Sequence, residues 1–172
     1  MKSHEIIFGS QVRVLLLGLD SAGKSTLLYR LSSGQAVMTL PTIGSNVEIV
    51  KYEKTKMRVL DIGGQEVMRP FWRCNFPKTN VVIFVVDSCD KERLPQVAQE
   101  ISLIGQEKCL KKSVLAIFAN KQDDSRHAIA IEQLKTELKL DQLNIQWQVF
   151  ATSGKTGMGI NDGMNWIVSH CK

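Results

Sequence analysis

The chain of 172 residues is 44% hydrophobic and 23% charged, and its formal net charge is +5. These values lie near the averages of globular proteins and exclude a disordered chain, a collagen-like repeat and a disulfide scaffold. The lysines and arginines are scattered, with the densest cluster at Lys108, Lys111 and Lys112. We therefore expect a solvated basic surface and no nucleic-acid partner.

The length suits one folded domain, which we expect to cover residues 1–172 and to include a short N-terminal segment, residues 1–10. The longest apolar run, from Asn80 to Val86, is strand-sized and well below the ~18 residues that cross a bilayer. The chain starts without the apolar stretch of a secretory signal, which predicts a cytoplasmic protein. The cysteines and histidines lack metal-ligand spacing, which argues against zinc.

Apolar runs alternate with segments of helical periodicity along the chain. The runs that predict strands are Val12 to Leu17, Asn46 to Tyr52, Met57 to Ile62, Val81 to Val86, Val114 to Ala119 and Trp147 to Ala151. Several of these are apolar without alternation and end in Gly, Asp or Asn, as strands buried on both faces of a parallel sheet do.

The predicted helices each carry one apolar stripe. They cover Lys24 to Leu31, Leu94 to Gln106, Ala130 to Leu138 and Ile160 to His170. In the second helix, for example, Val97, Ile101 and Ile104 recur at helical spacing. The alternation predicts an α/β fold, a six-stranded, mostly parallel sheet with helices on both faces, in which ligands bind beyond the carboxyl ends of the strands.

A phosphate-binding loop follows the first predicted strand. Gly18-Leu19-Asp20-Ser21-Ala22-Gly23-Lys24-Ser25 matches G-x-x-x-x-G-K-[ST], with a strand before it and a helix after it. Gly18 and Gly23 permit a tight turn whose N–H groups face an anion, and the helix start adds its positive dipole end. Lys24 then reaches the β and γ phosphates, and Ser25 ligates Mg²⁺. The alternative is an ordinary glycine-containing turn with an exposed lysine.

A second motif, Asp61-Ile62-Gly63-Gly64-Gln65, follows the third predicted strand. Asp61 can hold a water bound to Mg²⁺, Gly64 can offer its N–H to the γ-phosphate, and Gln65 can orient an attacking water. This set predicts phosphoryl transfer to water, with Gln65 and Lys24 as the catalytic residues. Taken alone, without the phosphate loop elsewhere in the chain, this glycine pair would indicate only an ordinary turn. Thr42, in a predicted loop, can add a second hydroxyl ligand to the metal.

The residues at the end of the fifth predicted strand indicate which base the bound nucleotide carries. Asn120-Lys121-Gln122-Asp123 places a carboxylate, Asp123, where it can accept from both N1–H and the N2 amine of guanine. Asn120 can bond N7 and neighbouring loops, and the Lys121 stem can cover the ring. Alone, N-K-x-D is equally a helix cap. After the sixth strand, the backbone of Ser153-Gly154-Lys155 can meet the guanine O6, although such a triplet is also a common glycine turn.

These residues together resemble the Arf-like (ADP-ribosylation factor-like) small GTPases over nearly the full length. The resemblance is carried by residues 18–26, which add Thr26 to the phosphate loop, and by 41–48, 61–65, 71–73, 85–88 and 120–123. It implies a switch that binds GTP or GDP with Mg²⁺ and hydrolyses GTP slowly. It also implies that Thr42 ligates Mg²⁺ in the GTP form.

The resemblance further implies partners. We expect an exchange factor, a GTPase-activating protein that supplies an arginine finger, and effectors that bind the GTP form in intracellular vesicle trafficking. We expect a monomer that is cytoplasmic or peripheral on internal membranes.

Three departures from the family pattern carry expectations of their own. Lys2 stands where myristoylation needs glycine, and the segment before the first strand is short, so membrane contact should be weak or indirect. The aromatic trio common at the family's switch surface is replaced by Ser45, Leu60 and Asn75. The partner set should therefore differ from that of typical members.

Two other functions fit parts of the sequence. A nucleotide kinase shares the phosphate loop but needs a second lid for its acceptor, and no insertion of that size is present. A binding module that holds GTP or GDP without turnover is a second alternative, against which Gln65 argues.

Overall fold

Six segments form one sheet in the computed structural model, which describes residues 11–34, 39 and 42–171. The strands are β1 (Val12–Leu17), β2 (Ser45–Tyr52), β3 (Thr55–Ile62), β4 (Val81–Asp87), β5 (Val114–Asn120) and β6 (Gln146–Ala151). Their order is β2-β3-β1-β4-β5-β6, and only the β2–β3 pair is antiparallel. The predicted six-stranded, mostly parallel sheet is confirmed.

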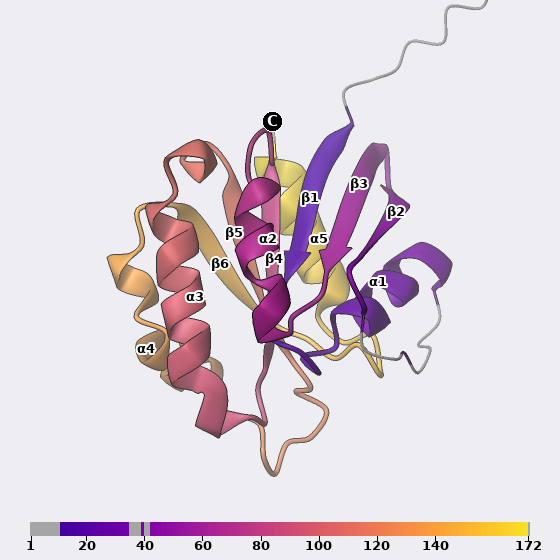
Figure 1. Ribbon diagram of the computed structural model, residues 1–172. Helices are drawn as coiled ribbons and strands as arrows, with labels where there is room; N and C mark the ends of the chain where they lie inside the picture. Colours follow the sequence, from indigo (N-terminus) through magenta and orange to yellow (C-terminus); the bar gives the residue numbers. More distant parts are fainter. Residues whose placement is uncertain (1–10, 35–38, 40–41, 172) are drawn as a thin grey trace, which may run out of the picture.

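Helices cover both faces of this sheet (Figure 1). The α-helices are α1 (Lys24–Ser33), α2 (Pro70–Cys74), α3 (Leu94–Gln106), α4 (Ile131–Glu137) and α5 (Ile160–His170). Four single 3₁₀ turns lie in the described chain, η1 (Glu66–Met68), η2 (Lys91–Arg93), η3 (Lys108–Leu110) and η4 (Leu140–Gln142). The predicted bounds of α3 and α5 match, and Pro95 lies in the first turn of α3, where a missing N–H costs no hydrogen bond.

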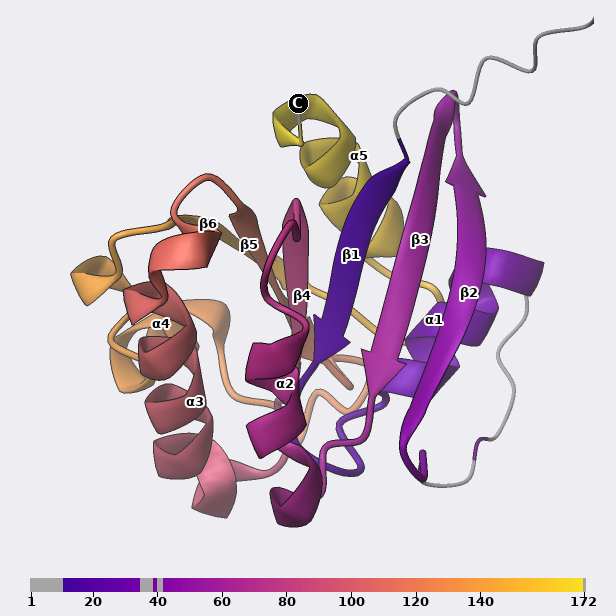
Figure 2. The ribbon, with the colours of Figure 1, turned by 45° about the horizontal axis from the view of Figure 1, so that its top comes forward.

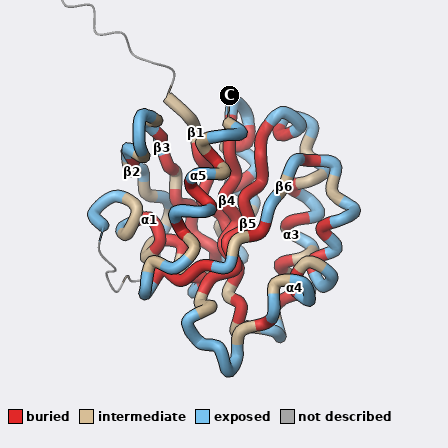
Figure 3. The backbone as a smooth tube through the Cα atoms, turned by 180° about the vertical axis from the view of Figure 1, so that it is seen from behind, coloured by how far each residue is buried: buried red, intermediate tan, exposed pale blue. Residues whose placement is uncertain are grey.

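The core consists of two clusters, one on each face of the sheet. Leu27 of α1 and Ile167 of α5 pack on one face, whereas Trp72 of α2 and Ile101 of α3 pack on the other. Figure 2 shows α2 and α3 on the near side of the strands and α1 and α5 on the far side. The central strands lie between both layers, so β5 is buried along its whole length (Figure 3). This explains why the apolar runs of the sequence do not alternate.

The short helix α2 was not among the predicted elements. Its five residues are too few for a helical period to show in the sequence. The buried Trp72 fixes it to the sheet, because the ring packs edge-on against Phe84 of β4 at a centroid distance of 6.0 Å. Tertiary contact, and not local propensity, therefore stabilises α2.

The loops that follow β1, β3, β5 and β6 all leave the same end of the sheet. β1 runs parallel to β3 and β4, and β5 runs parallel to β4 and β6, so their carboxyl ends point the same way. The phosphate loop and the motifs that begin at Asp61, Asn120 and Ser153 all lie at this end of the sheet. No helix in the described part of the chain is both long and apolar enough to span a membrane.

Candidate functional site: a nucleotide pocket at the strand ends

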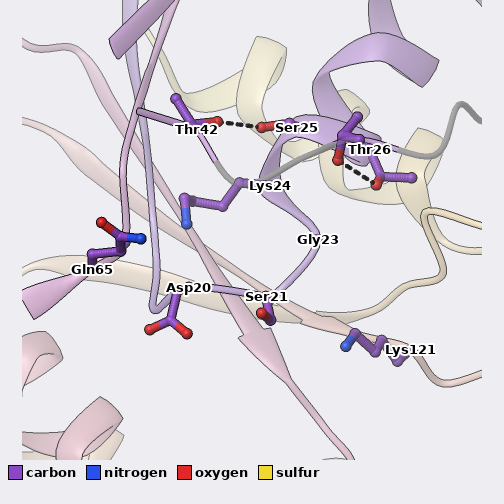
Figure 4. Close-up of a pocket in the computed structure, with 11 residues that line it drawn as sticks. Asp20, Ser21, Gly23, Lys24, Ser25, Thr26, Thr42, Gln65 and Lys121 are labelled. Carbon is purple, nitrogen blue, oxygen red and sulfur yellow. Dashed lines mark hydrogen bonds between the residues drawn. The ribbon is translucent and has the colours of Figure 1, made fainter. Parts of the chain in front are cut away.

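Two adjoining cavities occupy this end of the sheet. The first, of about 350 Å³, is lined by the phosphate loop together with Thr42, Gly64 and Gln65 (Figure 4). The second, of about 810 Å³, is lined by Asn120, Asp123, Gly154 and Lys155 among others. Gly23, Thr26 and Lys121 line both cavities. One elongated site therefore joins the predicted phosphate end to the predicted base end.

The phosphate loop crosses from β1 to α1 and ends in a left-handed glycine. Gly23 has φ of +95°, and a Cβ there would lie 2.4 Å from the Asn120 amide nitrogen. Only glycine fits this position, because the Asn120 side chain packs directly on the loop and φ is positive. Leu19 and Ala22 are buried, and they contribute backbone to the loop while their side chains join the core. Asp20, Ser21, Ser25 and Thr26 line the first cavity.

Lys24 is the central cation of the first cavity. Its side chain is 6% exposed, and Nζ donates to the carbonyls of Gly18 and Leu19 at 2.9 Å each. Burial lowers the pKa of Lys24 from its usual 10.5 to about 8, and the nearby carboxylates of Asp61 and Asp20 oppose this shift. A buried ammonium whose hydrogen-bond acceptors in the described part of the chain are two carbonyls is well placed to receive anionic oxygens.

Three oxygen-bearing side chains converge beside Lys24. The Ser25 hydroxyl donates to Asp61 Oδ2 at 2.6 Å and lies 2.8 Å from the Thr42 hydroxyl, which itself donates to Asp61 Oδ2 at 3.3 Å. Asp61 is fully buried, and its Oδ1 has no hydrogen-bond partner among the described residues. Burial raises the pKa of Asp61, while the Ser25 hydrogen bond and the Lys24 charge lower it. A buried carboxylate oxygen without a partner, beside two hydroxyls, suits a hard cation such as Mg²⁺.

The loop after β3 packs on the phosphate loop. A Cβ on Gly64 would lie 2.3 Å from the Leu19 carbonyl carbon and 2.4 Å from the Asp20 nitrogen. The glycine therefore serves the close approach of two backbones. From α2, the Trp72 indole donates to the Gly63 carbonyl at 3.1 Å, and Arg69, at the start of α2, donates to the Gly64 carbonyl at 3.2 Å. Gln65 follows as an exposed residue at the edge of the first cavity (Figure 4).

Asn120 connects the two ends of the site. Its Nδ2 donates to the Ala22 carbonyl in the phosphate loop, and its Oδ1 accepts from the Gly154 N–H, both at 2.8 Å. The sequence predicted contacts to neighbouring loops, and these are present. Nδ2 retains a second hydrogen, so the predicted contact to guanine N7 stays a prediction.

The carboxylate of Asp123 is held at the base end of the site. Its Oδ1 accepts from the Ser153 hydroxyl at 2.7 Å, and its Oδ2 lies 4.0 Å from Lys155 Nζ. Lys155 is largely exposed, so this ion pair contributes little to stability. Lys121 Nζ donates to Asp87 Oδ2 at 2.6 Å, which orients the lysine stem beside the cavity.

Sequence reasoning missed several residues that support the site. Arg93 binds the Asp20 carboxylate at 3.1 Å and also donates to the Asp20 carbonyl, which anchors the phosphate loop to η2. Asp87 holds Lys121, and Arg126 and His127 line the second cavity. Arg93, Arg126 and His127 belong to no contiguous motif, whereas Asp87 lies in the segment 85–88 that carries the resemblance. Only Asp87 gave a signal, as the polar residue that ends an apolar strand.

The fold and this site define a P-loop nucleotide-binding protein of the small-GTPase class. The model of the ADP-ribosylation factor family matches residues 2–171, and the chain belongs to this family. It is 45% identical to "ADP-ribosylation factor-like protein 1" of Saccharomyces cerevisiae, over 94% of this chain and 88% of that protein. The protein of the same name from Caenorhabditis elegans is 46% identical, over 95% and 91% of the respective chains.

A solved structure shows the same fold. It is the Arl6 BBS3 small GTPase from Trypanosoma brucei with the bound nucleotide analogue GppNp. The TM-score is 0.85 at 29% sequence identity, and the match covers 93% of this chain and 96% of that one. The predicted family and fold class are confirmed, and the chain is a guanine-nucleotide-binding GTPase switch.

Proposed function

We propose that the chain hydrolyses GTP in the first cavity and signals its nucleotide state to effectors in intracellular vesicle trafficking. The convergence of Ser25, Thr42 and Asp61 beside the buried Lys24 carries this proposal. Thr42 lies on the loop before β2, and Asp61 lies at the end of β3. Both ends of the β2–β3 hairpin therefore lie beside the place where the γ-phosphate would bind. Loss of the γ-phosphate on hydrolysis would release the hairpin at both ends.

Each polar side chain has a separate task in the proposed reaction. Lys24 binds the β and γ phosphates and balances their charge, and the N–H groups of residues 18–25 bind phosphate oxygens. The Gly64 N–H donates to the γ-phosphate. Gln65 orients the attacking water, whose oxygen forms a bond to the γ-phosphorus as the bond to the β-phosphate oxygen breaks.

Mg²⁺ fits the oxygens gathered beside Lys24. Ser25 and Thr42 would ligate the ion directly, and Asp61 would hold it through a water, which gives its unpartnered Oδ1 a donor. When bound, Mg²⁺ supplies charge compensation for the phosphates. Chelation should then speed GDP release from the wild type, whereas an Asp61→Asn variant should release GDP quickly with or without the chelator.

The base end of the site supports guanine as the base. Asp123 offers two acceptor oxygens to the two donors of the guanine edge, and the loop of residues 153–155, of which Gly154 and Lys155 line the same cavity, would supply a backbone N–H to O6. An exchange factor, a GTPase-activating protein with an arginine finger, and effectors complete the proposed cycle. Weak or indirect contact with internal membranes is part of the same proposal.

Two measurements test the proposed function. Nucleotide released by denaturing the purified protein should run as GDP or GTP on ion-exchange chromatography, and adenine nucleotides would contradict the base assignment. A multiple-turnover assay should show slow phosphate release that a GTPase-activating protein of the family stimulates. Tight GTP binding without stimulated release would instead favour a binding module without turnover.

A further inference from the structure

Arg30 of α1 contacts the loop after β6, on the base side of the site. Its Nε donates to the Gly154 carbonyl at 2.7 Å, and its Nη2 donates to the Lys155 carbonyl at 2.5 Å. A guanidinium is planar and presents these two N–H groups side by side, so two successive carbonyls are held in one fixed arrangement. A lysine ammonium has no such fork.

The two bonds also orient an N–H group. The Gly154 carbonyl and the Lys155 N–H belong to one trans peptide unit, in which oxygen and hydrogen point in opposite directions. By drawing the carbonyl toward α1, Arg30 turns the Lys155 N–H away from α1. Within the described residues, that N–H has no acceptor, whereas the Gly154 N–H donates to Asn120 Oδ1. Both residues line the larger cavity.

The same loop is tied to the carboxylate that binds the opposite part of the base edge. Ser153 Oγ accepts from the Thr156 N–H at 3.0 Å and donates to Asp123 Oδ1 at 2.7 Å. A shift of the loop would therefore move the donors for O6 and also the partner of Asp123. Arg30 is attached to α1, the helix that starts at Lys24, so the base loop is positioned against the element that binds the phosphates.

We propose that Arg30 is a positioning residue for recognition of the guanine O6, acting through the Gly154–Lys155 peptide. This inference rests on the proposed role of residues 153–155 in base binding. It goes beyond the sequence motifs, because Arg30 lies outside all of them and does not itself reach the base.

The experiment compares GDP with 6-thio-GDP, which keeps both donors for Asp123 and replaces O6 by sulfur, a weak acceptor. Affinities are measured at fixed Mg²⁺ by competition with a ribose-labelled fluorescent GDP. The wild type should prefer GDP. Arg30→Met should lower GDP affinity about 10-fold to 100-fold, as expected for the loss of one or two well-oriented hydrogen bonds, and should lower 6-thio-GDP affinity much less. The preference ratio, which is the affinity for GDP divided by the affinity for 6-thio-GDP, should therefore fall toward one.

Two further variants make the result specific. Arg30→Lys can bond one carbonyl and should give an intermediate ratio. Arg58→Met is the matched control, because Arg58 is exposed on β3 and has no ion pair within the described chain, so its ratio should equal that of the wild type. Circular dichroism and thermal unfolding check the fold of each variant, and the lysine variant carries the test if the methionine variant does not fold.

Several outcomes would overturn the inference. Equal weakening of both nucleotides would assign Arg30 a general structural role, as would failure of both Arg30 variants to fold. A wild type that does not distinguish the two nucleotides would show that O6 is not bound through hydrogen bonds. In each of these cases the wild type still binds GDP. A wild type that binds no guanine nucleotide would instead contradict the proposed function.

Discussion

The Ser153 hydroxyl donates to Asp123 Oδ1 at 2.7 Å, which joins the loop after β5 to the loop after β6. The fold thus orders the Asp123 carboxylate before a base binds. Base binding therefore loses less conformational entropy at this side chain. One oxygen is shared with Ser153, and both oxygens retain lone pairs for the guanine donors.

Asp123→Asn should weaken GTP binding by roughly two or more powers of ten, since a charge-assisted pair is lost and groups are left unpaired. One acceptor becomes a donor, which mismatches guanine but suits the extra carbonyl of xanthine. Titration with GTP and with xanthosine triphosphate checks this exchange of preference. Unchanged GTP affinity would contradict the assignment of Asp123 to guanine recognition.

Gln65→Leu should keep GTP bound but nearly abolish stimulated hydrolysis. Leucine cannot orient a water, whereas Lys24, Ser25 and the proposed Mg²⁺ ligands are unchanged. Single-turnover phosphate release with an activating protein measures the effect, with nucleotide affinity as the control. Equal rates for both proteins would mean that another group positions the water.

Lys24 should make the stability of the nucleotide-free protein depend on pH. Its pKa is about 8 in the folded chain against a usual 10.5, so between these values the unfolded chain binds more protons. The free energy of unfolding of the wild type should therefore rise with pH in this window, relative to that of a Lys24→Met variant. Below about pH 8 the difference in free energy of unfolding between the two proteins should not change with pH. Urea unfolding from pH 7 to about 10 tests the sign, and a difference that does not change with pH would refute the lowered pKa.

The substituted switch-surface residues should alter the choice of effector. Ser45 is exposed at the start of β2, whereas Leu60 is partly buried and Asn75 donates to the Phe71 carbonyl. Aromatic anchors often dominate interface energy, so restoring aromatics at all three positions should strengthen binding to Arf-type effectors. Pull-down with a panel of such effectors, using the GTP-analogue form, measures this. No change across the panel would contradict it.

The sequence was sufficient to predict those features of the fold and the site that depend on neighbouring residues in the chain. The phosphate loop, the motifs that begin at Asp61 and Asn120, and the buried strands all reside in short contiguous patterns. Arg93 and Arg30 could not be found in this way, because their partners Asp20 and Gly154 are distant in the chain. Thr42 was predicted as a second metal ligand from a loop, and folding brings its hydroxyl within 2.8 Å of the Ser25 hydroxyl. The predicted N-terminal segment, residues 1–10, lies outside the described residues.

The Asn120 amide bonds the Ala22 carbonyl and the Gly154 N–H at the same time. Substitutions at the two ends of the nucleotide site should therefore not act additively. In a double-mutant cycle that pairs a phosphate-loop change with a base-loop change, the coupling free energy should fall once Asn120 is replaced by alanine. Guanosine and pyrophosphate, offered as separate fragments, should likewise bind with positive cooperativity, and the Asn120→Ala variant should show less of it.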